Sequence, residues 1–452
     1  MKKIILMVFL ALALILGIIF YWLWHVRKGG PDETLPPWSG LAVKKHNSTN
    51  ISFGMGYIAI VKENGELWIW GVDKNRSENH DRIEDAWKLA DNVAKAIPLA
   101  PWSDSEAPLF LGILFKDGSF WIWDIAVEMN ALGQLQPSHF MPAPEKIMIG
   151  VSDISADSNS FFALKTNHSL WNVSAKTWLK KPSFYDKVFI TYKKQDNVKA
   201  FWINPTDYSQ VYMLTKDGNL IGFGENGQGQ LGVGFRGGEI ENNYLLVPRE
   251  VTDSVSSVIT TLDWVELYTR TMALKNDHSL WLWGYDIIYD PASGRLSSYV
   301  PVKVMDNVMS GSISSNHALI VKRDNSLWTW GYNNYGQLGT GNYEDITEPV
   351  KIMDDTISVF AGFDYSIALQ EDHTLWAWGS NEFGQLGTGD TASRTEPVKI
   401  MEDIAAFEMY SHCNVAVKED GSIWLWGHPT THIDAIQPDE GVYISTPVCI
   451  MQ

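Results

Sequence analysis

Residues 372–401 read DHTLWAWGSNEFGQLGTGDTASRTEPVKIM, and this stretch holds the features that decide the fold. A tight turn leads into Leu-Trp-Ala-Trp-Gly, which is followed by a glycine-rich loop and then by Pro-Val-Lys-Ile-Met. The apolar segment Ile367–Gln370 precedes the turn and completes a hairpin, and similar hairpins recur eight times in the 452 residues. A repeat of about 50 residues built only from short strands predicts a radial or stacked β architecture.

The hairpin turns mark the repeat most clearly. The eight residue pairs are Asn64-Gly65, Asp117-Gly118, Asn167-His168, Asp217-Gly218, Asp277-His278, Asp324-Asn325, Asp372-His373 and Asp420-Gly421. Successive pairs are separated by 53, 50, 50, 60, 47, 48 and 48 positions, so an insertion is expected between Gly224 and Ser279. Asn or Asp followed by Gly favours a two-residue loop of type I′, in which both residues have positive φ. We therefore predict type I′ turns.

Pairs of tryptophans follow most of these turns. The pairs are Trp68/Trp70, Trp121/Trp123, Trp281/Trp283, Trp328/Trp330, Trp376/Trp378 and Trp424/Trp426. Unit three keeps only Trp171, and unit four has Ile221 and Phe223 instead. Alternation along a strand places both members of a pair on one face, where they can fill the gap between neighbouring sheets. We assign these 13 of the 21 tryptophans to packing rather than to ligand binding.

A glycine-rich loop and an edge strand complete the unit. The loop Asn334–Gly341 recurs as Glu382–Gly389, with weaker versions at residues 227–232 and 131–135. The strands that follow begin with proline, which has no N–H to donate and therefore suits an outer edge. They are Pro301–Met305, Pro349–Met353, Pro397–Met401 and Pro447–Met451.

Taken together, these motifs resemble the repeat of the regulator of chromosome condensation family, from about Leu41 to Gln452. The resemblance implies an all-β fold, a single β-propeller of four-stranded antiparallel blades at residues 41–452. Eight hairpins predict eight blades, whereas seven is the common number in the family. No extra hairpin of the kind that the nuclear exchange factor uses on its GTPase is recognised, so exchange activity is not implied.

The N-terminal segment predicts a membrane anchor. The 21 residues from Ile4 to Trp24 carry no charge, and as a helix they would span roughly 30 Å, the thickness of a bilayer core. We expect residues 1–30 to be an uncleaved signal anchor and residues 31–40 a linker, with a cleaved signal peptide as the alternative. The short leader is typical of a bacterial single-pass membrane protein, and its short N-terminal tail predicts a propeller outside the cytoplasm.

Composition and motifs argue against several functions. A net charge of −18 disfavours nucleic-acid binding, which needs clustered Lys and Arg. Cys413 and Cys449 fall on the second and fourth strands of one unit, too far apart for a disulfide. There is no nucleophile elbow, phosphate-binding loop or spaced Cys/His zinc pattern, so no enzyme activity, metal or cofactor is expected. His168, His278 and His373 are interpreted as turn residues.

The favoured function is therefore a non-catalytic scaffold that binds an unknown protein partner. Tyr335 and Phe383 occupy equivalent places in two glycine-rich loops, and Trp102 and Trp264 lie in segments that break the repeat. Aromatic side chains in loops are typical anchors of protein interfaces, so these four residues are the candidate contacts. The alternative is an enzyme that acts on extracellular or cell-wall glycan through the irregular loops of units two to four. Two carboxylates beside an aromatic platform would favour that alternative.

Overall fold

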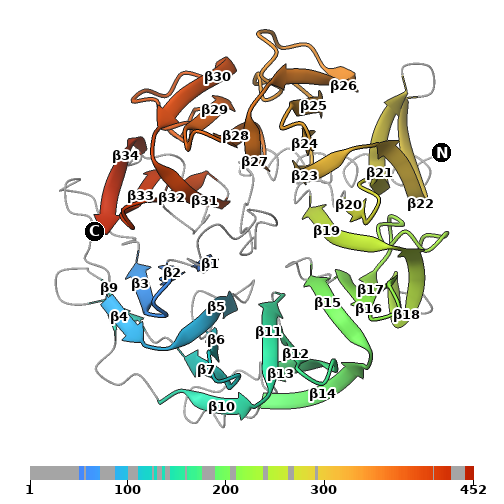
Figure 1. The fold of residues 1–452 in the computed structure, drawn as a ribbon, viewed down its shortest axis with the longest axis vertical. Coiled ribbons are helices and arrows are strands. Elements are labelled where there is room, and N and C mark those ends of the chain that lie inside the picture. The colour runs from blue at the N-terminus through green and yellow to red at the C-terminus, as the bar shows by residue number, and fades with distance from the viewer. Residues whose placement is uncertain are drawn as a thin grey trace, which may run out of the picture. The chain divides into compact units, whose positions relative to one another are not determined.

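In the computed structural model, eight four-stranded antiparallel sheets follow one another around a ring (Figure 1). The described residues are 50–54, 57–71, 87–99, 110–124, 127–129, 135–137, 143–157, 160–175, 189–203, 210–237, 243–262, 269–290, 294–410, 412–428 and 443–451. Each sheet is a blade, numbered here in chain order, with its first strand towards the centre of the ring and its last strand outermost (Figure 1). The predicted β-propeller is confirmed, with eight blades rather than seven.

The strands of the first four blades are as follows. Blade 1 has β1 (Asn50–Gly54), β2 (Tyr57–Val61), β3 (Leu67–Gly71) and β4 (Trp87–Ala90); blade 2 has β5 (Val93–Leu99), β6 (Phe110–Phe115), β7 (Phe120–Asp124) and β10 (Glu145–Met148). Blade 3 has β11 (Val151–Ala156), β12 (Ser160–Lys165), β13 (Leu170–Ala175) and β14 (Phe189–Gln195); blade 4 has β15 (Val198–Ile203), β16 (Gln210–Thr215), β17 (Asn219–Glu225) and β18 (Tyr244–Asp253).

The last four blades continue in the same order. Blade 5 has β19 (Val255–Leu262), β20 (Thr269–Lys275), β21 (Leu280–Asp290) and β22 (Gly294–Met305); blade 6 has β23 (Val308–Ile313), β24 (His317–Lys322), β25 (Leu327–Gly331) and β26 (Ile346–Met353). Blade 7 has β27 (Thr356–Ala361), β28 (Tyr365–Gln370), β29 (Leu375–Gly379) and β30 (Arg394–Met401); blade 8 has β31 (Ile404–Tyr410), β32 (Cys413–Lys418), β33 (Ile423–Gly427) and β34 (Ile444–Met451).

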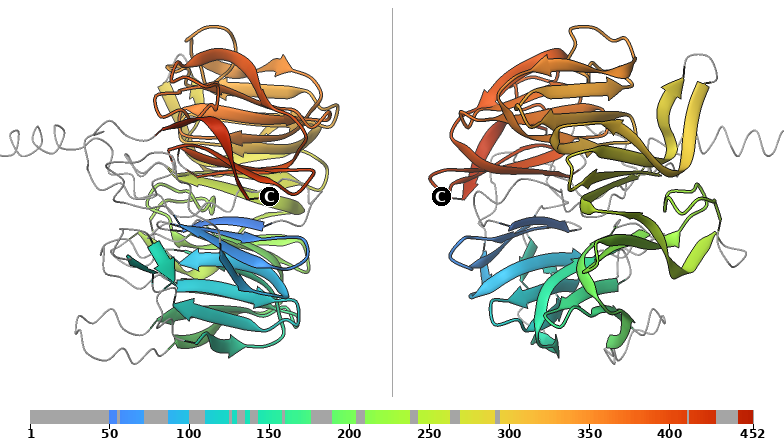
Figure 2. Two further views of the ribbon diagram at one scale, coloured as in Figure 1. Left: turned by 90° about the vertical axis from the view of Figure 1, so that its left-hand side faces the viewer. Right: turned by 45° about the vertical axis from the view of Figure 1, so that its right-hand side comes forward.

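Two hairpins go beyond the plain repeat. In blade 2, β8 (Val127–Met129) pairs with β9 (Leu135–Pro137) between the third and fourth strands of the sheet. In blade 5, β21 and β22 continue as a two-stranded arm, with Ile288 opposite Leu296 and Asp290 opposite Gly294. The arm is the long yellow hairpin of Figure 2. Neither hairpin was predicted from the sequence. Each takes the place of a loop, and the repeat spacing around it is of ordinary length.

The type I′ prediction for the hairpin turns is wrong. Only the second residue of each pair has positive φ, for example Gly65 at 90° and His373 at 64°. In the first turn the Gly65 N–H donates to the Lys62 carbonyl (2.8 Å), and the Lys62 N–H donates to the Glu66 carbonyl (2.9 Å). This is the three-residue loop in which a type I turn is followed by a left-handed residue. Asn or Asp is favoured before that residue because its side chain accepts from the backbone N–H two residues on, as Asn64 does from Glu66.

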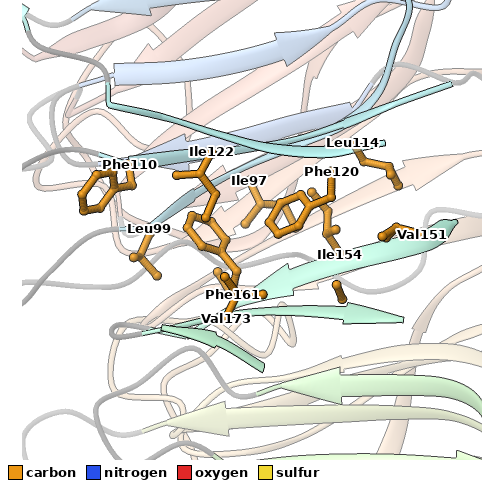
Figure 3. Close-up of a cluster of buried hydrophobic side chains, with 12 residues drawn as sticks. Ile97, Leu99, Phe110, Leu114, Phe120, Ile122, Val151, Ile154, Phe161 and Val173 are labelled. Carbon is orange, nitrogen blue, oxygen red and sulfur yellow. The ribbon is translucent and has the colours of Figure 1, made fainter. Parts of the chain in front are cut away.

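The hydrophobic core lies between blades. Each of eight buried clusters joins side chains of two neighbouring sheets. Figure 3 shows the cluster between blades 2 and 3, where the rings of Phe120 and Phe161 meet edge to face with centroids 5.8 Å apart. A Cβ added to Gly112 would lie 2.6 Å from the Phe161 ring, so a residue without a side chain is needed here to leave room for that ring. Each blade is therefore stabilised mainly by its neighbours.

The C-terminal strand closes the last blade, as predicted for Pro447–Met451. Val448 of β34 lies opposite Leu425 of β33, and Trp424 lies opposite Cys449. Among the described residues, blades 8 and 1 pack together through a cluster that includes Val415, Leu425, Ile58 and Ile60. Cys413 and Cys449 are free thiols, as expected. The sequence of Leu41–Lys44 resembles the same outer strand and competes as a prediction for its place. This segment and the predicted anchor at residues 1–30 lie outside the described residues, and within those described no helix is long and apolar enough to cross a bilayer.

Candidate binding surface

The propeller has two faces with different construction. The hairpin face carries the turns between the second and third strands of each blade, together with the turns that lead from one blade to the next. The loop face carries the connections between first and second strands and between third and fourth strands. Antiparallel order places these two sets of connections at opposite ends of the strands.

A belt of backbone hydrogen bonds links the hairpin face from blade to blade. At the first junction the Val93 N–H donates to the Gly65 carbonyl and the Lys116 N–H donates to the Asn92 carbonyl, both at 2.8 Å. The same pair of bonds recurs at most later junctions, ending with Ile404 to His373 and Glu419 to Asp403. The residue before each inner strand from blade 2 onward has positive φ. These residues are Asn92, Gly150, Asn197, Ser254, Asn307, Asp355 and Asp403.

The first tryptophan of each pair is tied to its own turn. The Trp376 indole N–H donates to the Thr374 hydroxyl (2.9 Å), which donates to the Asp372 carboxylate (2.6 Å). That hydroxyl holds the pKa of Asp372 below its usual range. Equivalent chains are Trp121–Ser119–Asp117, Trp171–Ser169–Asn167, Trp281–Ser279–Asp277 and Trp328–Ser326–Asp324. The assignment of these tryptophans to structure rather than to binding therefore has a direct physical account.

On the loop face, three glycine-rich loops dock on the following blade. In blade 6 the Gln337 carbonyl accepts from the Ser366 hydroxyl (2.8 Å) and the Trp378 indole (2.9 Å) of blade 7. In blade 7 the Gln385 carbonyl accepts from Asn414 (2.9 Å) and Trp426 (3.0 Å) of blade 8. The loop of blade 4 makes the related set. There the Gln230 carbonyl accepts from Thr271 and Tyr212, and Trp283 donates to the Tyr212 hydroxyl.

Close approach of backbones explains the glycines of these loops. Gly336 has φ 79°, and a Cβ there would lie 2.8 Å from the Cα of Thr395 on the outer strand of blade 7. The Gly341 N–H donates to the Thr395 carbonyl at 2.9 Å. The side chain of Asn333 closes the loop internally by accepting from the Leu338 N–H (2.9 Å). The loops are therefore fixed platforms, and only their outward side chains are free to differ.

Of the two candidate contacts in the glycine-rich loops, Tyr335 and Phe383, the solvent-exposed one is Tyr335. Its side chain is 39% exposed, and its backbone N–H is held by the Gln337 side chain at 2.9 Å. The negative charge of Asp364, with partial burial and the charge of Glu382, raises the pKa of the Tyr335 hydroxyl. Asp364 accepts from the Asn316 side chain at 2.8 Å. The ring thus stands exposed in an acidic setting.

Phe383, at the equivalent position, is enclosed. Its ring centroid lies 4.5 Å from that of His412, 5.9 Å from His428 and 5.7 Å from Tyr443. Burial, with a contribution from the charge of His428, lowers the pKa of His412 to about 4, so this imidazole is neutral at neutral pH. Phe383 joins blade 7 to blade 8, whereas Tyr335 faces solvent. The other two candidates, Trp102 and Trp264, lie outside the described residues.

One serine–histidine arrangement resembles catalytic machinery but is buried. His317 Nε2 lies 2.8 Å from Ser366 Oγ, and its Nδ1 lies 2.9 Å from Ser314 Oγ. The imidazole is 1% exposed, and burial, with the charge of Arg270, lowers its pKa to about 3. The Ser366 hydroxyl is committed to the Gln337 carbonyl. These bonds join blade 6 to blade 7 and leave no open position for a substrate.

A surface that sequence reading missed lies at the outer edge of blades 4 and 5. Phe235, Leu246, Val247 and Val300 are 44%, 61%, 52% and 51% exposed. Phe235 belongs to the glycine-rich loop of blade 4, and the other three belong to the outer strands β18 and β22. A comparison of loop and edge positions between units would have revealed them, because the same positions are polar in later blades.

Comparison with known proteins agrees with this construction. Two models of the regulator of chromosome condensation (RCC1) repeat match, one at residues 324–369 and 372–406 and the other at 310–337 and 357–385. The matches fall on blades 6 to 8, where the tryptophan pairs and docked loops are most regular. Residues 310–406 therefore carry RCC1 repeats.

Solved structures show the same fold at low sequence identity. Human WBSCR16 is 14% identical with a TM-score of 0.52, over 74% of this chain and 94% of that one. Prp20p from Saccharomyces cerevisiae is 19% identical with a TM-score of 0.50, over 67% of this chain and 77% of that one, and its structure was described together with its binding to Gsp1p and histones. No curated protein matches the sequence.

Proposed function

We propose that this RCC1-repeat propeller is a non-catalytic scaffold that binds another protein on the outer side of the cell membrane. The observation that carries the proposal is the construction of the loop face. The backbone carbonyls of Gln230, Gln337 and Gln385 accept hydrogen bonds from side chains of the next blade, which fixes the loop backbones, while the outward residues differ from loop to loop. A rigid backbone with variable exposed side chains suits recognition of a protein, because little entropy is lost on binding.

The family likeness supports the same function. Prp20p, with the same fold, was studied for binding to Gsp1p and histones. A different partner is expected here, because residues 1–30 predict placement outside the cytoplasm and the net charge of −18 suits a neutral or basic surface better than an acidic one.

A glycan-acting enzyme is the second candidate, and one feature favours it. Tyr335 lies near the carboxylates of Asp364 and Glu382, which together make an aromatic platform beside two acids. Asp364, however, accepts hydrogen bonds from the side chains of Asn316 (2.8 Å) and Gln337 (3.4 Å), so its carboxylate already holds neighbouring loops together. An assay of purified full-length protein on cell-wall glycan separates the two functions. Release of sugar that is lost in Asp364→Asn would establish the enzyme instead.

The binding function is tested by cross-linking on intact host cells that produce the full chain with a C-terminal tag. Mass spectrometry is expected to identify a protein enriched over a control strain whose anchor carries an unrelated domain. Absence of any enriched protein contradicts the scaffold. The membrane placement is tested separately. N-terminal sequencing is expected to show that residues 1–24 are retained, and external protease is expected to digest the propeller.

A further inference from the structure

The glycine-rich loops of blades 6 and 7 contact the next blade through the same backbone hydrogen bond. The Gly341 N–H donates to the Thr395 carbonyl (2.9 Å), and at the following junction the Gly389 N–H donates to the Ser445 carbonyl (2.7 Å). The two junctions therefore have the same backbone geometry. The aromatic residue of each loop can be compared position by position with the residues that face it from the next blade.

At the junction of blades 7 and 8, the chain itself covers the aromatic ring of the loop. Phe383 packs against the rings of His412, His428 and Tyr443. The His428 N–H donates to the His412 carbonyl at 2.9 Å, and Tyr443 directly precedes the residue of β34 that lies opposite Gly427. These relations define three covering positions that can be found in any blade.

At the junction of blades 6 and 7, the three covering positions hold side chains without a ring. They are Asp364, Ser380 and Ser393, as shown by the register of blade 7 and by the hydrogen bond from the Ser380 N–H to the Asp364 carbonyl (2.9 Å). Tyr335 consequently remains 39% exposed. The repeat thus leaves uncovered at this junction an aromatic ring that it encloses at the next.

The charges around Tyr335 are almost all negative. The described segments 331–348, 362–364 and 379–396 carry the carboxylates of Glu344, Asp345, Glu348, Asp364, Glu382, Asp390 and Glu396. The cation on these segments is Arg394, which is paired with Asp390 at 2.7 Å. The charge of Asp364, followed by partial burial and the charge of Glu382, raises the pKa of the Tyr335 hydroxyl, so both carboxylates act on this ring.

The repeat does not need a carboxylate at either of these two positions. Blade 6 carries Asn316 in the place of Asp364, and Asn334 in the place of Glu382. The hydrogen bonds that Asp364 accepts from Asn316 and Gln337 could equally be accepted by an amide oxygen. The two negative charges are therefore additional to what the junction requires.

We propose that Tyr335, Asp364 and Glu382 bind an arginine or lysine side chain from a basic segment of the partner protein. The inference rests on the proposed scaffold function and gives it a contact site and a partner chemistry. A cation over the exposed face of Tyr335 would be attracted by the ring and by both carboxylates. A basic partner also complements the net charge of −18.

The test uses full-length protein in mild detergent and two labelled peptides at physiological salt. One peptide alternates Arg with Ser, and the other has citrulline, which is uncharged but of similar shape, in place of every Arg. Fluorescence anisotropy is expected to show saturable binding of the Arg peptide below about 1 mM, and binding of the citrulline peptide roughly tenfold weaker or less. Absence of saturable binding of the Arg peptide, or equal binding of the two, overturns the proposal.

Two variants with the same change of charge separate this site from a general attraction to an acidic protein. Asp364→Asn with Glu382→Asn installs the residues that blade 6 carries and is expected to weaken the Arg peptide at least roughly tenfold. The control, Asp355→Asn with Asp403→Asn, removes two carboxylates from the hairpin face, where other blades have Asn with positive φ. It is expected to leave the affinity within about twofold. Equal effects of the two double variants overturn the proposal.

The contribution of the ring is tested at Tyr335. Tyr335→Phe keeps the aromatic face and is expected to leave the affinity for the Arg peptide within about twofold, whereas Tyr335→Ala is expected to weaken it roughly threefold or more. Thermal melting of both variants checks that the fold is retained. An Ala variant that is folded and binds like the Phe variant shows that the ring takes no part, and the proposed site is then wrong.

The partner identified by cross-linking separates this inference from the scaffold function. If that partner binds the protein with Asp364→Asn and Glu382→Asn at least roughly tenfold more weakly than the unaltered protein, the site is supported. If the partner binds both proteins equally, the scaffold function stands and its contact surface lies elsewhere.

Discussion

The hairpin face and the loop face are built from the same repeat, yet they differ in how far the eight copies diverge. On the hairpin face, a positive-φ residue, an Asn or Asp before it, and hydrogen bonds to the next blade recur around the ring. On the loop face, docked glycine-rich loops are described in blades 4, 6 and 7, while blades 2 and 5 carry extra hairpins. Side chains recur where backbone geometry demands them and vary where solvent is the only neighbour.

The largest expected effect concerns β34, the outer strand of blade 8, which runs between the loop face and the hairpin face of the propeller. Truncation after Tyr443 removes β34 and the packing of Ile444, Ile450 and Met451 on blades 8 and 1. The loss is expected to be on the order of 5 kcal/mol, with a fall in melting temperature of roughly 10 °C or more. Removal of Gln452 alone is the control. An unchanged melting temperature would show that another segment, such as Leu41–Lys44, supplies the strand.

Within one tryptophan pair, removing the residue nearer the loop face of the propeller should destabilise the protein more than removing the residue nearer the hairpin face. Trp378 is fully buried and donates to the loop of blade 6, whereas Trp376 is half-buried and donates to its own turn. We expect Trp378→Ala to lower the free energy of unfolding by about 3–5 kcal/mol and Trp376→Ala by about 1–2 kcal/mol. Urea unfolding followed by circular dichroism measures both. Equal losses would show that the docked loop adds nothing beyond the buried ring.

On the loop face itself, the two aromatic residues of the neighbouring loops should behave differently. Phe383→Ala removes a ring packed against His412 and Tyr443 and is expected to cost about 1–2 kcal/mol of stability. Tyr335→Ala is expected to change stability by less than about 0.5 kcal/mol. With a cross-linked partner in hand, Tyr335→Ala tests whether the exposed ring is a contact. A strongly destabilised Tyr335→Ala protein would show instead that both rings are structural.

The smallest expected effect concerns a buried position at which one blade carries a polar residue and most other blades carry an apolar one. Thr329 lies between Trp328 and Trp330, where blades 1, 2, 5, 7 and 8 carry Ile, Leu or Ala, and its hydroxyl is buried without a hydrogen-bond partner. We expect Thr329→Val to raise the free energy of unfolding by about 1 kcal/mol, because it removes an unsatisfied polar group. Thr374→Val is the matched control and should destabilise, because Thr374 links Trp376 to Asp372.

The sequence allowed the architecture to be predicted because the determinants are local and repeated. Asn or Asp in each turn, Trp at alternate strand positions and Pro in the outer strands located all eight blades, including unit three with its single Trp171. The turn type was predicted wrongly because an Asn-Gly pair fits both a two-residue loop and a three-residue loop. Which of the two forms depends on the backbone groups that hydrogen-bond across the turn. The candidate contacts were only partly resolved, since the enclosure of Phe383 depends on His412 and His428 from another blade. The exposed apolar residues of β18 and β22 were recognised only after the strand register had aligned Val300 with Glu396.

The packing of blade 8 on blade 1 has a consequence for how the ring assembles. At the other seven junctions the described chain passes directly from one sheet into the next, so neighbouring blades are joined covalently. The contact of Ile58 and Ile60 with Val415 and Leu425 instead joins residues more than 350 positions apart. Closing so long a loop has the largest entropic cost in the fold. The ring is therefore expected to close last at this seam and to open first there, so amide exchange in β1 and β32 reports the earliest step of unfolding.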